Sequence, residues 1–171
     1  MLWQLLAARD YLAAMTLMRK HKVDMNLAVD YDAAGFFRDV LPAPAAETGS
    51  GGESGSTLLT QLGSLGPHLL SLFIASLRSD SVLDTLYPFA PQPANAPVSP
   101  NWSALAASMG LTRMQVVDGP GATSKVDAVC DLMQEAIKAQ PDGKLRTCMV
   151  LTFVRRHPPR VEDALQHLQV F

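Results

Sequence analysis

The sequence predicts an all-α protein, an irregular α-solenoid of helical hairpins with disordered loop insertions. Apolar residues recur at the three- and four-residue spacing of an α-helix over most of the chain. No continuous alternation of apolar and polar residues demands a sheet, although residues 111–117 could pair locally. Stretches rich in proline and glycine separate the helical segments, which share no fixed-period consensus. An irregular array is therefore favoured over a strict repeat family.

Composition narrows the class of protein. The 171 residues allow one domain that buries roughly two thirds of the surface of the unfolded chain. Net charge is −2 and no segment is strongly basic, which argues against a dedicated nucleic-acid-binding domain. The two cysteines form no Cys-x-x-Cys pair, which is typical of a reducing compartment. The longest apolar stretch, residues 69–77, is too short to cross a bilayer, so we expect a cytoplasmic protein without membrane contact.

Residues 1–41 are predicted to form a helical hairpin. The first helix runs from Leu2 to Met18 and ends in a cationic corner, where Asp24 can cap the next helix. The second runs from about residue 25 to residue 41, with a break expected near residues 30–32. Its inward-facing residues are Leu27, Phe36, Phe37 and Val40. The capless start of the first helix and the apolar end of the chain at Phe171 suggest a piece of a longer array.

Two insertions frame a second helical segment. Residues 42–57 hold no large apolar side chain and are predicted to be a flexible Gly/Ser linker. Helices are expected over 58–87, where Pro67 opens one and Ser79 or Asp80 caps another. The residues expected to face inward there are Leu69, Leu70, Leu72, Phe73, Ile74, Leu77, Val82, Leu83 and Leu86. Residues 88–122 read as a proline-rich extended segment with a short helix from Asn101 to Leu111.

Residues 123–171 are predicted to form three helices. Ser124 caps the first, a second begins near Leu145 and ends at His157, and a third follows the prolines after it. The residues expected to face inward are Val126, Val129, Cys130, Met133, Ile137, Leu145, Cys148, Met149, Thr152, Phe153, Val161, Leu165 and Leu168.

Three stretches in the same order resemble the helical part of the largest, scaffolding subunit of the Elongator complex, the IKAP family. They lie within residues 9–30, 85–91 and 125–133, and their main runs are Met18-Arg19-Lys20-His21-Lys22-Val23-Asp24-Met25-Asn26-Leu27, Thr85-Leu86-Tyr87-Pro88-Phe89-Ala90-Pro91 and Lys125-Val126-Asp127-Ala128-Val129-Cys130-Asp131-Leu132-Met133. The resemblance covers roughly residues 2–41, 69–91 and 124–171. Three collinear matches are more specific than any one of them.

The resemblance implies a solenoid segment that follows two propeller domains and holds other Elongator subunits for the modification of wobble uridines in tRNA. The chemistry, with its iron–sulfur cluster, S-adenosylmethionine and acetyl-CoA, belongs to a different subunit of that complex. No catalytic residue of the family therefore maps onto this chain, and the partners implied are other Elongator subunits and the rest of the chain's own array. The resemblance agrees with a cytoplasmic location, and an additional nuclear pool is compatible with it.

No pattern of catalytic or cofactor-binding residues emerges from the sequence. The four histidines are scattered, residues 49–55 lack the Lys-Ser/Thr of a phosphate loop, and the methionines favour core use. The chain is thus interpreted as non-catalytic, without cofactor or metal. One basic cluster is a candidate contact for a partner or for RNA: Lys144, Arg146, Arg155, Arg156 and Arg160. A structural or partner-facing role is favoured over tRNA, because cations are stabilised at a helix C-terminus and acidic neighbours offset them.

Two other classes of protein are alternatives to this hypothesis. A helical adaptor of a vesicle-coat or trafficking complex has similar hairpins, and the collinear stretches disfavour it. A small helical hydrolase or transferase is disfavoured because no catalytic constellation is present.

Overall fold

The computed structural model describes residues 1–40, 57–91, 93, 100–111, 123–138 and 143–169, and within them every regular element is a helix. The elements are α1 (Leu2–Ala7), α2 (Tyr11–His21), α3 (Leu27–Asp30), α4 (Ala33–Val40), α5 (Thr57–Ser76), α6 (Val82–Thr85), α7 (Trp102–Ser108), α8 (Lys125–Lys138), the 3-10 helix η2 (Gly143–Leu145), α9 (Arg146–Val154) and α10 (Val161–Gln169). The predicted all-α fold is confirmed.

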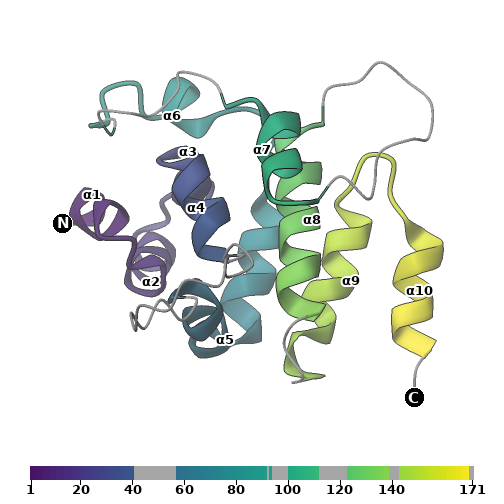
Figure 1. The fold of residues 1–171 in the computed structure, drawn as a ribbon. Helices are drawn as coiled ribbons and strands as arrows, with labels where there is room; N and C mark the ends of the chain where they lie inside the picture. The colour runs from purple at the N-terminus through teal and green to yellow at the C-terminus, as the bar shows by residue number, and fades with distance from the viewer. Residues whose placement is uncertain (41–56, 92, 94–99, 112–122, 139–142, 170–171) are drawn as a thin grey trace, which may run out of the picture.

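The helices pack as neighbouring pairs that proceed from one end of the molecule to the other (Figure 1). At one end α1 lies against α2, and at the other α9 lies between α8 and α10. Between them α5 contacts α2, α4 and α9. The core is continuous through these helices and includes the fully buried rings of Phe36, Phe37 and Phe73.

The prediction of one unbroken helix over residues 2–18 is wrong. The chain divides into α1 and α2 at Arg9, whose φ of 58° is left-handed, and Asp10 then caps α2 by accepting from a backbone N–H at 3.0 Å. From this break the Arg9 guanidinium reaches Asp32 and Asp39, each at 3.4 Å. The cap and these two contacts offset the energetic cost of the left-handed backbone conformation at Arg9. The periodicity of apolar residues does not reveal such contacts.

The inward faces predicted for α4 and α8 are confirmed, because all the residues named for them are buried. Ser124 caps α8 as expected, because its hydroxyl accepts from the Asp127 backbone N–H at 3.1 Å. α5 bends at Gly66, where φ is 70°, and Pro67 opens its second half as predicted. Along this half one prediction is wrong, since the Leu72 side chain is 46% exposed.

α10 carries the clearest error in the predicted core. Val161, Leu165 and Leu168 were expected to face inward, and they are 55%, 49% and 47% exposed. The side chains that meet α9 are instead Ala164, which is buried, and His167, whose ring stacks on Phe153 at 5.1 Å. α10 lies at the edge of the molecule against α9, so one side of its apolar face remains open (Figure 1).

The short helices α6 and α7 lie where the sequence predicts them, but the cap of α6 differs from the predicted one. α7 is present with Asn101 as its N-cap, which accepts from the Ala104 N–H at 3.0 Å. α6 is capped by Ser81 rather than by Ser79 or Asp80. The linker predicted at 42–57, most of the proline-rich segment and the local pairing at 111–117 fall almost wholly outside the described residues, so they stay predictions.

A buried ion pair joins three parts of the fold. Lys125 Nζ at the start of α8 lies 2.6 and 2.8 Å from the two carboxylate oxygens of Asp30 in α3, and both side chains are almost completely buried. The same ammonium donates to the Asp80 carbonyl at 3.1 Å, and the Val82 N–H donates to Asp30 at 2.8 Å. Burial raises the pKa of Asp30 and lowers that of Lys125, whereas the contact between the two charges acts in the opposite direction.

Removing one member of this pair should be more damaging than removing both charges. Lys125→Met leaves an uncompensated buried carboxylate and should lower the free energy of unfolding by about 3–5 kcal/mol, whereas the double variant Asp30→Asn, Lys125→Met should lose less. Urea denaturation measures both. A double variant less stable than Lys125→Met would contradict the prediction.

The stability of Lys125→Met should also depend on pH in a defined direction. Without the ammonium, burial holds the pKa of Asp30 above its ordinary value of 3.8, so the folded state binds the proton more tightly than the unfolded state. Relative to wild type, the variant should therefore lose stability as the pH rises above that value. If the difference in free energy of unfolding between wild type and the variant is the same at acidic and neutral pH, Asp30 is not left charged and buried.

Substitutions in the core should destabilise the fold far more than substitutions on the exposed face of α10. Met15 is 1% exposed and Leu165 is 49% exposed, so Met15→Ala should cost about 2–5 kcal/mol and Leu165→Ala within about 0.5 kcal/mol. Thermal or urea unfolding of the two variants measures this difference. A large loss with Leu165→Ala would mean that α10 is covered in solution.

Candidate functional site

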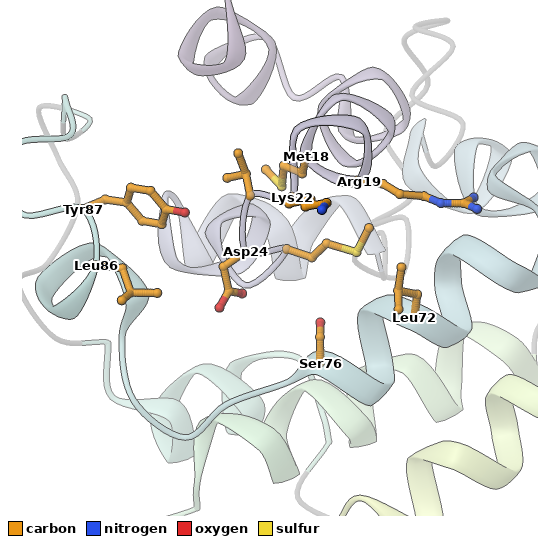
Figure 2. A pocket seen from close by; sticks show the side chains of 10 residues that line it. Met18, Arg19, Lys22, Asp24, Leu72, Ser76, Leu86 and Tyr87 are labelled. Atoms are coloured by element: carbon orange, nitrogen blue, oxygen red, sulfur yellow. The ribbon is translucent and has the colours of Figure 1, made fainter.

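A pocket opens where the turn from α2 to α3 meets α5 and the segment after α6 (Figure 2). We call it the corner pocket. Its volume is about 440 Å³, and its lining residues are Met18, Arg19, Lys22, Val23, Asp24, Met25, Leu72, Ser76, Leu86 and Tyr87. The side chains reach it from three separate parts of the chain, so it depends on the tertiary fold.

The turn that forms one wall is specified locally. α2 ends at Lys22, which adopts a left-handed φ of 55°, and the Val23 N–H returns to the Met18 carbonyl at 2.9 Å. Asp24 then accepts from the backbone N–H of Asn26 at 2.9 Å. These contacts reverse the chain tightly and leave Arg19 and Lys22 exposed beside the pocket.

A buried asparagine fixes this wall to the opposite one. Asn26 is completely buried, and its amide nitrogen donates to Asp24 at 2.7 Å and to the Ser76 carbonyl at 2.9 Å. Its amide oxygen accepts from the Arg78 N–H at 3.0 Å. Because every polar atom of the side chain has a partner, the network holds the corner and the end of α5 at a set separation.

The charges around the pocket leave a cationic edge. The Asp24 carboxylate is bound by Asn26 and lies 3.8 Å from Arg78, so its charge is compensated. Arg78 also makes two hydrogen bonds to Asp80 and thereby holds the pKa of that carboxyl below its usual range. In the described part of the chain, no salt bridge joins Arg19 or Lys22 to an acidic side chain.

The lining combines apolar side chains with polar and charged ones. The Ser76 hydroxyl donates to the Phe73 carbonyl at 2.9 Å, and no histidine or cysteine lies among the lining residues that the structure describes. Across the described ranges, no group of three His, Cys, Asp or Glu residues could hold a metal ion. The thiols of Cys130 and Cys148 are both buried, and burial raises the pKa of Cys130 to about 12. Both cysteines therefore belong to the core.

The predicted basic cluster does not gather into one exposed patch. Arg155 donates to the Leu77 carbonyl at the end of α5, and Arg156 is 5% exposed and pairs with Asp131 of α8. Both therefore attach the end of α9 to its neighbours.

The other members of the cluster lie apart from these two. Arg160 lies 3.7 Å from Asp163 within its own turn, and Arg146 is half-buried at the start of α9. The side chain of Lys144 lies outside the described residues. A contact between this cluster and a partner or RNA stays a prediction.

The sequence indicated the cationic corner and missed the pocket. Helical spacing predicts inward positions for Leu72 and Leu86, whereas they are 46% and 50% exposed and line the opening. Periodicity places an apolar residue on a face and does not say whether that face is covered. One feature of the sequence could have pointed to the pocket. Two stretches that carry the family resemblance, 18–27 and 85–91, both combine apolar and polar residues at turns.

No protein-family model matches the sequence. The chain is 26% identical over 153 residues to putative elongator complex protein 1 from Xenopus laevis. The chain is a distant homologue of a segment of that protein. The aligned part covers 90% of this chain and 10% of the frog protein, so the chain spans about a tenth of the length of that relative. The resemblance identified from the three collinear stretches is thereby confirmed at the level of distant homology.

No helix within the described ranges combines the length and the apolar character needed to span a bilayer.

Asn26 should be a structural determinant of the corner pocket. Asn26→Ala leaves the Ser76 carbonyl and the Arg78 N–H without their buried partner, at about 1–3 kcal/mol for each group. The Arg78 amide should also exchange faster with solvent. The exposed neighbour substitution Lys20→Ala is the control and should change stability by less than about 0.5 kcal/mol. An unchanged Arg78 exchange rate would contradict the proposed link.

Proposed function

We propose that this chain is a non-catalytic scaffold segment of the Elongator complex, which holds partner subunits and so supports the modification of wobble uridines in tRNA. The observation that carries the proposal is the similarity to elongator complex protein 1 over 90% of the chain. The helical pairs agree with a scaffold, because stacked helices present extended surfaces to other proteins.

Exposed apolar groups support an interaction role. The open face of α10, formed by Val161, Leu165 and Leu168, is the kind of surface that a neighbouring helix or subunit covers. Phe89, in the segment after α6, is 98% exposed. The partners in this proposal are other Elongator subunits and the rest of a longer helical array.

A tRNA contact through the basic cluster is the less favoured part of the proposal. Arg155 and Arg156 are engaged by the Leu77 carbonyl and by Asp131, so few of its cations remain to meet phosphates. The proposed location is the cytoplasm with a nuclear pool. A trafficking adaptor remains the alternative from the interaction class, and the sequence similarity supports Elongator over it.

Affinity purification from the native organism tests the assignment. The tagged natural protein should enrich other Elongator subunits over a tag-only control, and its depletion should lower wobble-uridine modification in tRNA. Enrichment of vesicle-coat subunits instead would favour the adaptor, and enrichment of neither set would contradict the scaffold role.

A further inference from the structure

We propose that the corner pocket docks a short segment of a partner protein in which an apolar side chain is flanked by carboxylates. The inference deepens the proposed scaffold role and rests on it, by naming one surface and the chemistry of its occupant. Nothing in the sequence similarity specifies either of them.

The apolar part of the pocket requires an apolar anchor. Met18 and Met25, buried in the fold, line it together with the exposed side chains of Leu72 and Leu86. Leucines that are about half exposed at the mouth of a hollow lose that water contact when a partner side chain enters. Unbranched methionine side chains adjust to the shape of the entering group. A volume of about 440 Å³ has room for side chains of a peptide.

The edge of the pocket selects the charge of the occupant. Arg19 and Lys22 lie exposed on it, while the lining carboxylate, Asp24, is already bound by Asn26 and faces Arg78. Figure 2 shows Arg19 and Lys22 on the α2 side, with Leu72 and Leu86 on the other sides of the hollow. Carboxylates next to the apolar anchor would therefore complement this edge, and a cationic segment would be repelled.

A protein segment fits better than nucleic acid. Phosphate backbones are bound by tracks of cations, and here the cations border an apolar hollow that a phosphate would leave unfilled. The mixture of apolar floor and charged rim is instead the usual composition of a protein interface.

The pocket is also pre-formed. The hydrogen bonds of Asn26 to Asp24, Ser76 and Arg78 connect its two walls, so little ordering is needed when a segment binds. All of its lining residues except Leu72 and Ser76 lie in two of the stretches that carry the family resemblance, 18–27 and 85–91.

Methionine-methyl NMR of the intact chain provides the test. The probe is a short synthetic peptide in which leucines alternate with glutamates, and the expected result is saturable shifts of the Met18 and Met25 methyl signals without a shift of Met133 in α8. Two control peptides, with lysines in place of the glutamates or alanines in place of the leucines, should bind at least about tenfold more weakly.

Neighbouring charge reversals provide matched variants. Arg19→Glu should weaken binding of the leucine–glutamate peptide by about fivefold to tenfold, because it reverses a charge on the pocket edge. Lys20→Glu makes the same change at the next residue, which is exposed and lies outside the lining, and should leave binding within about twofold. Leu86→Ala should weaken binding without unfolding the chain, because Leu86 is 50% exposed.

Several outcomes would overturn the inference: no shift of Met18 or Met25, equal binding of the lysine peptide, equal effects of the two charge reversals, or equal shifts produced by a single-stranded oligonucleotide. Failure here while Elongator subunits still co-purify removes the pocket inference and leaves the scaffold role intact. Failure of co-purification while the peptide binds removes the assignment to Elongator and leaves the docking surface.

Discussion

The ion pair between Asp30 and Lys125 is the contact on which the arrangement of the helices depends most. It joins α3 to α8 across 95 residues of sequence and, through Val82 and Asp80, adds the segment around α6. Leu27, Ala28 and Val29 of α3 are buried as well. A buried pair of this kind contributes little net stability, because both charges lose their water, yet it tolerates few alternative packings. We therefore expect it to act chiefly on which arrangement forms.

Much of the fold was accessible from the sequence because most helices bury a face that their own spacing defines. The residues named for the inward faces of α4 and α8 are all buried, and the cap at Ser124 followed from residue type. The larger errors came from tertiary packing that local sequence does not show. The division of the first helix at Arg9 depends on Asp32 and Asp39, and the exposed side of α10 depends on its position at the edge.

The candidate site was less predictable for a related reason. The cations after α2 were evident as a local run, whereas the hollow beside them exists only because α5 and the segment after α6 approach that turn. The basic cluster shows the reverse effect. Arg155 and Arg156 are adjacent in sequence, and the fold directs them toward a carbonyl and a carboxylate of neighbouring helices. The sequence thus shows which charged residues are present, and tertiary packing determines which of them remain exposed for a partner.

The attachment of α10 through α9 has a consequence for cooperativity. An element that packs mainly along one side can open without exposing the rest of the core, so we expect α10 to be able to open locally. A neighbour that covers Val161, Leu165 and Leu168 would slow this opening and so suppress a fluctuation of the free chain. Amide exchange in α10 would then slow when a partner covers its exposed face, even at residues that the partner does not contact.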